Sequence, residues 1–361
     1  MNDDEPYMRL ALDLAGQRLG TTSPNPTVGA VLVRQGEVVG QGVTQPVGGP
    51  HAEVEAIREA GEKAAGAVLY VTLEPCAHHG RTPPCVDRVL SSGIARVVCA
   101  MIDPDARVSG RGVERLRQAG VEVTVGVLER EARRLNAYYV KHRTTGLPFV
   151  VLKLAQSLDG RIATASGDSK WITGEAARRR AHGLRSRVDA VLVGAGTVVA
   201  DDPMLTVRMV EGRDPARIVV DSALRIPEKA RILGPGRVIV ATADRADEGR
   251  ARRLRERGAE VWRFPGADGR VDLRALVAEL GRKDFLSVMI EGGGQVAASA
   301  LRAGLVDQVQ VFIAPRLIGA GVGAVGGLNI AGITEAVRLA DVEVEPVGDD
   351  LLYVANVVPS P

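Results

Sequence analysis

The stretch that decides the fold of the first half reads Gly49-Pro-His-Ala-Glu53, followed by Glu74-Pro-Cys-Ala-His-His-Gly-Arg-Thr-Pro-Pro-Cys85. It contains three metal-ligating side chains: His51, Cys76 and Cys85. One imidazole and two thiolates can hold a zinc ion and leave its fourth position open for water. The carboxylate of Glu53, two residues after the histidine, can take a proton from that water and pass it to a departing amino group. The stretch therefore predicts a catalytic zinc site.

Each residue of this set also has a simpler interpretation. Taken alone, His51 could be a helix-cap or surface residue, and Glu53 a solvated carboxylate in the first turn of a helix. The two cysteines could form a structural zinc site with His78 or His79. The combined order H-x-E…P-C…C is that of zinc-dependent deaminases, and we predict the catalytic site on that order. Cys99 lies in an apolar run and is predicted to be inert core.

Hydrophobic periodicity around this stretch predicts helices that alternate with short strands. We expect helices at 7–19, 51–60, 111–119 and 128–142, a turn leading into a helix at 81–92, and strands at 28–33, 37–41, 67–73, 96–101 and 121–125. The segment Arg143-Thr-Thr-Gly-Leu-Pro148 is short, contains glycine and proline, and separates a charged helix from an apolar strand. We place a domain boundary there, which gives domains 1–145 and 146–361.

The same alternation restarts in the second half. Strands are predicted at 149–154, 190–193, 218–220, 238–241, 260–263, 286–290 and 309–313, and helices at 175–185, 246–257, 273–280 and 295–303. The segment 350–357 is predicted to add an edge strand. Two glycine-rich turns, Gly194-Ala-Gly-Thr197 and Gly292-Gly-Gly294, follow predicted strands, and backbone N–H groups there can approach a pyrophosphate. This half has no G-x-G-x-x-G, so no Rossmann fingerprint is expected.

Composition excludes several classes of protein. The chain has 361 residues, with 46 Lys and Arg against 44 Asp and Glu, and only 3% aromatic residues. The chain therefore lacks both the excess of positive charge and the aromatic side chains that nucleic-acid binding uses. No apolar run has the length of a membrane span, and the first residues show no signal-peptide pattern. Three cysteines are too few for a disulfide framework. We expect a cytoplasmic protein with no nucleic-acid or membrane partner.

The quoted stretch, together with Ser23-Pro-Asn-Pro-Thr-Val-Gly29, resembles the deaminase half of the bifunctional riboflavin-biosynthesis deaminase/reductase family. The second half resembles the reductase half through Lys153-Leu-Ala-Gln-Ser-Leu-Asp-Gly-Arg-Ile162, Ser169-Lys-Trp-Ile-Thr173, His182-Gly-Leu-Arg185 and Ile290-Glu-Gly-Gly-Gly294. The resemblance implies an N-terminal cytidine-deaminase-like three-layer α/β domain and a dihydrofolate-reductase-like α/β domain. It also implies two steps. Zinc-dependent hydrolysis would deaminate 2,5-diamino-6-(5-phosphoribosylamino)pyrimidin-4-one, and NADPH would then reduce the ribosyl group to ribityl.

The resemblance assigns residues by position. In the first domain His51, Cys76 and Cys85 would bind one zinc ion per chain, Glu53 would be the proton shuttle, and Asn25 and Arg81 would contact the substrate. In the second domain the substrate contacts would be Ser169, Arg185, Leu205, Arg208 and Glu291. The NADPH site would be lined by Ala155, Trp171, Thr197, Asp201, Ser222, Gly293, Gly294, Gln295, Val296, Ala297, Ala298 and Ser299. We also expect the chain to form a homo-oligomer.

Two positions depart from the family pattern. Thr44 stands where a histidine is frequent, and Asp105 stands where asparagine usually follows Asp-Pro. Neither belongs to the zinc set, so they put the substrate contacts in question and not the chemistry. Two other functions stay open on sequence alone. One is a nucleoside or nucleobase deaminase with an unrelated appended domain, and the other is an RNA-editing or RNA-binding module on the deaminase fold, which the charge balance disfavours.

Overall fold

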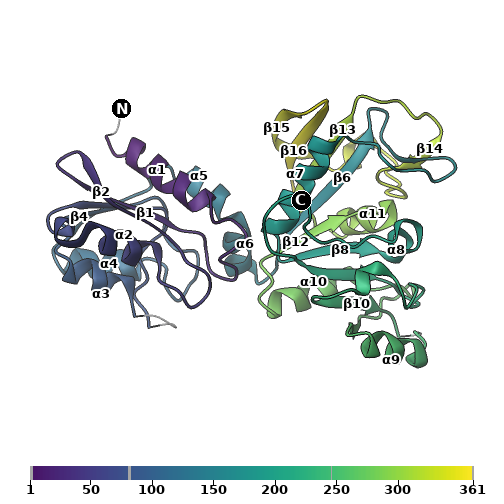
Figure 1. Ribbon diagram of the computed structural model, residues 1–361, viewed down its shortest axis with the longest axis horizontal. Helices are drawn as coiled ribbons and strands as arrows, with labels where there is room; N and C mark the ends of the chain where they lie inside the picture. Colours follow the sequence, from purple (N-terminus) through teal and green to yellow (C-terminus); the bar gives the residue numbers. More distant parts are fainter. Residues whose placement is uncertain (1–2, 80–82, 245, 360–361) are drawn as a thin grey trace. The chain divides into compact units, whose positions relative to one another are not determined.

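The chain forms two compact units, Met1–Gly146 and Leu147–Pro361 (Figure 1). This computed structural model describes residues 3–79, 83–244 and 246–359. No helix in those ranges is long and apolar enough to cross a membrane.

The first unit is built on a five-stranded sheet in the order β2-β1-β3-β4-β5. Its strands are β1 (Gly29–Arg34), β2 (Glu37–Val43), β3 (Val68–Val71), β4 (Arg96–Cys99) and β5 (Glu122–Val125). β1 is antiparallel to β2 and β3, whereas β3, β4 and β5 run parallel.

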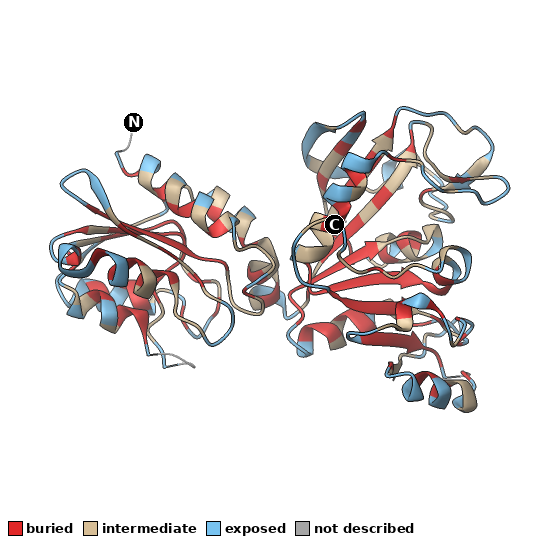
Figure 2. Ribbon diagram, in the orientation of Figure 1, coloured by how far each residue is buried: buried red, intermediate tan, exposed pale blue. Residues whose placement is uncertain are grey.

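Helices cover both faces of this sheet, with α1 (Glu5–Gly16) and α5 (Glu129–Leu135) on one side and α2 (Ala52–Ala60), α3 (Cys85–Ser91) and α4 (Arg111–Gln118) on the other (Figure 1). A short 3-10 turn, η1 (Gly61–Ala64), follows α2. Strand β1 is buried along nearly its whole length, as a strand between two helical layers must be (Figure 2). The three-layer arrangement predicted from the sequence is confirmed.

The helix predicted over 128–142 is wrong as a single element. α5 ends at Leu135, and a second helix, α6 (Ala137–Thr145), begins two residues later. Between them Asn136 leaves helical geometry, with φ −101° and ψ 25°. Its side-chain amide donates to the Thr27 carbonyl and accepts from the Thr27 N–H, both at 2.9 Å. A tertiary contact across 109 residues therefore accompanies the break.

The second unit is built on a nine-stranded sheet in the order β11-β10-β9-β8-β12-β6-β13-β16-β15. Neighbouring strands from β11 to β13 are parallel, and β16 is antiparallel to both of its neighbours. The strands are β6 (Phe149–Ser157), β8 (Ala190–Gly194), β9 (Ala216–Val220), β10 (Val238–Thr242), β11 (Glu260–Arg263), β12 (Ser287–Glu291), β13 (Gln308–Ala314), β15 (Leu339–Val347) and β16 (Asp350–Val357). A separate pair joins β7 (Arg161–Thr164) and β14 (Gly321–Gly323).

Helices pack on both faces of the large sheet. They are α7 (Glu175–Arg187), α8 (Ala195–Asp201), α9 (Glu248–Glu256), α10 (Leu273–Arg282) and α11 (Gly294–Arg302), with 3-10 turns η2 (Arg231–Leu233) and η3 (Ile333–Glu335). Side chains of α10 and α11, among them Leu276 and Ala300, join the main core with the central strands. On the other face, Ala177 and Ala181 of α7 pack with Phe312 and Leu352. Parallel strands buried in this way explain the continuous apolar runs of the sequence.

The segment 350–357 is a strand, as predicted, but its predicted edge position is wrong. β16 lies between β13 and β15, and β15 forms the edge. β15 was not predicted because its side chains are mostly exposed and give no buried apolar run. α8, β7 and β14 were also not predicted as elements, since each is short.

Candidate active sites

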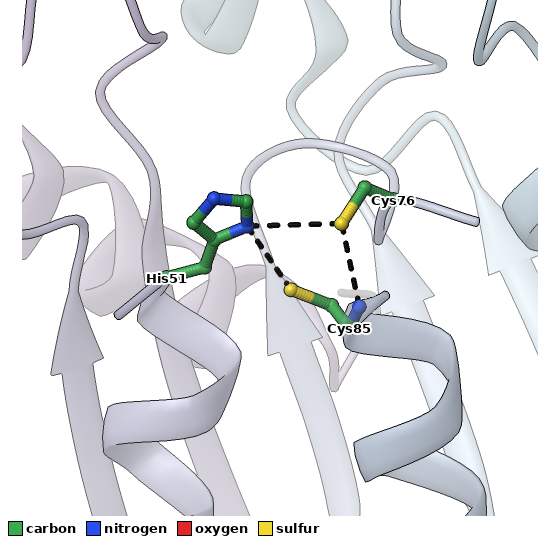
Figure 3. Close-up of side chains that lie close together, drawn as sticks. All are labelled: His51, Cys76 and Cys85. Carbon is green, nitrogen blue, oxygen red and sulfur yellow. Dashed lines mark hydrogen bonds between the residues drawn. The ribbon is translucent and has the colours of Figure 1, made fainter. Parts of the chain in front are cut away.

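Three metal-ligating side chains meet in the first unit (Figure 3). His51 lies immediately before α2, Cys76 follows β3, and Cys85 begins α3. The His51 Nδ1 atom is 3.1 Å from the Cys85 sulfur and 3.7 Å from the Cys76 sulfur. Tetrahedral zinc at ordinary bond lengths would separate nitrogen from sulfur by about 3.6 Å. The donors therefore fit zinc. Among the described residues this is the one such group, and it contains neither His78 nor His79.

The two thiols differ in protonation. Hydrogen bonds from the Cys85 side chain and from His51 lower the pKa of Cys76 to about 4, and the shared proton raises the pKa of Cys85. The Cys85 backbone N–H also donates to the Cys76 sulfur, at 3.3 Å. These hydrogen bonds favour the thiolate form of Cys76, which is the form of cysteine that binds metals.

Glu53 lies in the first turn of α2 and is 4% exposed. Burial raises the pKa of its carboxyl group to about 7. A carboxyl group that titrates near neutrality can both accept and release a proton at the pH of the cell. Its position on the same turn as His51 places this carboxyl group beside the metal-ligating side chains.

Glu74 and Gly112 hold the segment that carries Cys76. The buried Glu74 carboxylate accepts hydrogen bonds from four backbone N–H groups, those of Asp103, Gly110, Gly112 and Val113, at 2.7–3.2 Å. A Cβ on Gly112 would lie 2.0 Å from the Pro75 carbonyl oxygen, so α4 packs directly on the Pro75 backbone. Neither residue was predicted from the sequence, although Glu74 lies two residues before the predicted ligand Cys76.

The loop 23–29 carries the predicted substrate contact Asn25, which is half-buried. The Thr44 hydroxyl accepts a hydrogen bond from the Val28 N–H at 3.1 Å, so this departure from the family pattern anchors the loop. Asp105, the other departure, pairs with Arg107, which holds the pKa of the Asp105 carboxyl at about 2. Arg81 lies outside the described residues.

A charged cluster lies at the end of β12 in the second unit. Arg185 donates to both carboxylate oxygens of Glu291, at 2.7 and 2.8 Å, and Lys153 lies 3.3 Å from one of them. Burial alone would raise the pKa of Glu291, but these two cations hold it at about 2. Two predicted substrate residues are therefore paired with each other.

The loop that contains Leu205 and Arg208 is fixed to α7. Arg185 donates to the Thr206 carbonyl at 3.1 Å, and the Arg208 N–H donates to His182 Nδ1 at 3.0 Å. Leu205 is buried with φ +54°, while the Arg208 side chain is exposed. The guanidinium of Arg208 is therefore the more accessible of the two predicted phosphate contacts.

The two glycine-rich turns lie side by side at the ends of β8 and β12. Gly293 has φ +85°, and a Cβ there would meet the Thr197 hydroxyl at 3.4 Å. A Cβ on Gly194 would lie 2.9 Å from the Val296 side chain. Glycine at these positions therefore lets the two turns pack closely against each other.

The remaining predicted NADPH residues are spread around these turns. The predicted substrate contact Ser169 lies 3.5 Å from Asp201 of the NADPH set. Trp171 is 61% exposed, and the Arg178 guanidinium lies 4.6 Å from the centre of its ring. The Ser222 hydroxyl accepts from the Val271 N–H at 3.1 Å. Gly294, Ser299 and Ala155 are partly buried, and Gln295 is exposed, whereas Ala297 and Ala298 face the core.

Comparison with known proteins identifies the family to which the chain belongs. Residues 148–353 match the RibD C-terminal domain, and residues 1–101 match the cytidine and deoxycytidylate deaminase zinc-binding region. The chain belongs to the RibD family. It is 46% identical to the riboflavin biosynthesis protein RibD of Aquifex aeolicus, with 97% of each chain covered, and 46% identical to that of Escherichia coli, with 88% and 89% covered.

Solved RibD structures share the whole fold. Acinetobacter baumannii RibD has a TM-score of 0.88 at 38% identity, with 99% of each chain covered. A diaminohydroxyphosphoribosylaminopyrimidine deaminase/5-amino-6-(5-phosphoribosylamino)uracil reductase from Thermotoga maritima has a TM-score of 0.87 at 38% identity, with 98% of each covered. The chain is thus a deaminase and reductase of riboflavin biosynthesis. The predicted cofactors, zinc and NADPH, are consistent with this membership. A RibD-type second domain also removes the alternative of an unrelated appended domain.

Proposed function

We propose that the deaminase unit of this RibD-family chain acts on 2,5-diamino-6-(5-phosphoribosylamino)pyrimidin-4-one through zinc held by His51, Cys76 and Cys85. The observation that carries this proposal is the convergence of one imidazole and two sulfurs beside the buried Glu53. Asn25 and Arg81 would contact the pyrimidine.

Zinc, when bound, supplies a Lewis acid that makes water a nucleophile near neutral pH. Glu53 would take a proton from the attacking water and deliver it to the amino group that leaves as ammonia. Its burial keeps it out of bulk solvent, so the proton it carries passes between the reacting groups. Backbone contacts join the two cysteines, because the N–H groups of Cys85 and Val86 donate to the sulfur and the carbonyl oxygen of Cys76, at 3.3 and 3.2 Å.

In the reductase unit, Ser169, Arg185, Leu205, Arg208 and Glu291 would hold the deaminated substrate, with Arg208 reaching its phosphate. Arg185 would act mainly by keeping Glu291 ionised and the loop after α8 in place, since its guanidinium already bonds to both. The glycine turns, with Thr197 and Ser222, would bind the NADPH. Hydride transfer then depends on how the cofactor and the ribosyl group are oriented.

The deaminase and reductase would occupy residues 1–145 and 146–361, which agrees with the two compact units. A cytoplasmic site of action follows from a site that needs reduced thiols. A homo-oligomer is supported by the edge strand β15, where Val342 and Val344 are 51% and 57% exposed. Sedimentation of the full chain would test the assembly.

Mass spectrometry of the zinc-loaded full chain with the diaminopyrimidinone phosphate tests both steps. Without NADPH the product should be about one mass unit heavier, because oxygen replaces an amino nitrogen. With NADPH it should gain about two further mass units, because a hydride and a proton are added. Chelated protein is the control for the first step. An unchanged substrate mass with zinc present would refute the deaminase proposal.

A further inference from the structure

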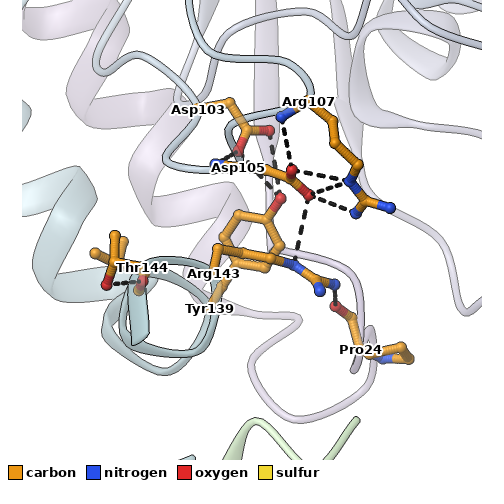
Figure 4. Close-up of polar contacts among 8 residues, drawn as sticks. Pro24, Asp103, Asp105, Arg107, Tyr139, Arg143 and Thr144 are labelled. Carbon is orange, nitrogen blue, oxygen red and sulfur yellow. Dashed lines mark hydrogen bonds and ion pairs between the residues drawn. The ribbon is translucent and has the colours of Figure 1, made fainter. Parts of the chain in front are cut away.

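The pair α5–α6 contacts loops of the deaminase unit from outside the matched zinc-binding region, which ends at residue 101. These helices hold none of the metal ligands. Asn136, which lies between the two helices, and α6 nevertheless contact the loop 23–29 and the loop 103–107 (Figure 4). These contacts indicate a role beyond packing for this part of the chain.

The Asn136 side chain holds the loop 23–29 by bonding to the backbone of Thr27. The side chain is 4% exposed and satisfies both the N–H and the carbonyl of Thr27, at 2.9 Å each. The next two residues are held from other elements, because Val28 N–H donates to Thr44 and Gly29 N–H donates to Thr72. A loop pinned at three consecutive residues has little freedom left to lose when a ligand binds.

Contacts further along α6 act on the same region. The Arg143 guanidinium lies 3.4 Å from the Pro24 carbonyl oxygen and stacks over Tyr139 at 5.1 Å (Figure 4). The Tyr139 hydroxyl donates to the buried Asp103 carboxylate at 3.1 Å. One helix thus ties together two loops that are distant in sequence, and Asn25 lies between the contacts at Pro24 and Thr27.

We propose that Asn136 is a positioning residue of the deaminase, which holds the loop 23–29 in the conformation that receives the pyrimidine. This inference rests on the proposed function, in which Asn25 of that loop contacts the substrate. Both polar atoms of the Asn136 side chain bond to Thr27 and Asn136 is not one of the metal-ligating residues, so its effect should fall on substrate binding.

The test is Asn136→Ala in the zinc-loaded full chain. Two backbone groups of Thr27 then lose their partners, and KM for deamination should rise about ten-fold with kcat and bound zinc unchanged. Hydrogen exchange in a peptide covering the loop 23–29 should become faster. Thr144→Ala is the matched control, since the Thr144 hydroxyl donates to the carbonyl oxygens of Val140 and Lys141 in its own helix. Asn136→Asp keeps an acceptor for the Thr27 N–H, so it should retain partial protection of the loop if Asn136→Ala folds poorly.

The outcomes separate the two proposals. An active parent whose KM is unchanged by both Asn136 variants would overturn the inference, and so would faster exchange without a change in KM, which would mark a structural role only. A parent that does not deaminate the pyrimidine would instead refute the proposed function, and the inference would fall with it.

Discussion

Replacing Glu74 by glutamine should destabilise the deaminase unit without touching a metal ligand. The carboxylate accepts from Gly112 and Val113 through one oxygen and from Asp103 and Gly110 through the other. Glutamine keeps one oxygen, but its amide nitrogen faces two backbone donors in place of the second oxygen. Each hydrogen bond to a charged group contributes about 1.5–3 kcal/mol. The loss of two such bonds should therefore lower the free energy of unfolding by about 3 kcal/mol or more.

For a unit of this size, 1 kcal/mol shifts Tm by about 2–4 °C, so Glu74→Gln should lower Tm by about 6–12 °C. Calorimetry of the zinc-loaded full chain, with a zinc-sensitive dye present, would assign the affected transition to the unit that releases zinc. The matched control is Glu129→Gln, because Glu129 is a half-buried helix residue whose carboxylate pairs with Arg133 at i,i+4. Such a pair contributes about 0.3–0.5 kcal/mol. Equal Tm shifts in the two variants would refute the role assigned to Glu74.

Two further predictions address the reactions, and a third addresses the stability of the reductase unit. Glu53→Gln should abolish deamination. Bound zinc should stay near stoichiometric, and the reduction of supplied deaminated substrate should persist. Retained deamination would exclude Glu53 as the proton carrier. Arg208→Lys should weaken binding of the phosphorylated substrate by about 1.5–3 kcal/mol, because an ammonium cannot donate the two coplanar hydrogen bonds of a guanidinium. The affinity for NADPH should not change. An equal loss for a dephosphorylated substrate would exclude the phosphate contact. Burial, with the neighbouring arginine charges, lowers the pKa of His182 to about 4. The unfolded chain therefore takes up this proton first, and the stability of the reductase unit should fall as the pH drops from about 6.5 to 4, less steeply in His182→Asn. Identical pH slopes in denaturant unfolding would contradict this assignment.

The sequence was most informative where chemistry restricts residue types. Zinc accepts few ligands, so His51, Cys76 and Cys85 could be named from their order alone, and the structure brings their donor atoms together. The buried strands could also be predicted from the sequence, because parallel strands covered on both faces need continuous apolar runs. Amphipathic spacing likewise predicted most helices.

Pairings between distant residues could not be predicted in this way. Arg185 and Glu291 were each expected to contact substrate, and nothing in either local sequence shows that they bond to each other across 106 residues. The break at Asn136 has the same origin, since the local pattern favours a continuous helix and its partner Thr27 lies far away. β15 was missed because an exposed edge strand carries no core-facing pattern.

The interior position of β16 bears on how protein synthesis ends. Strand β15 is made first, but in the sheet it is joined only to β16, which in turn lies against β13. A product of premature termination before Asp350 would leave β13 with an open edge and β15 without a partner, and both would be templates for aggregation. We expect such shortened chains to be removed by proteolysis, so that only full translation yields a reductase that persists in the cell.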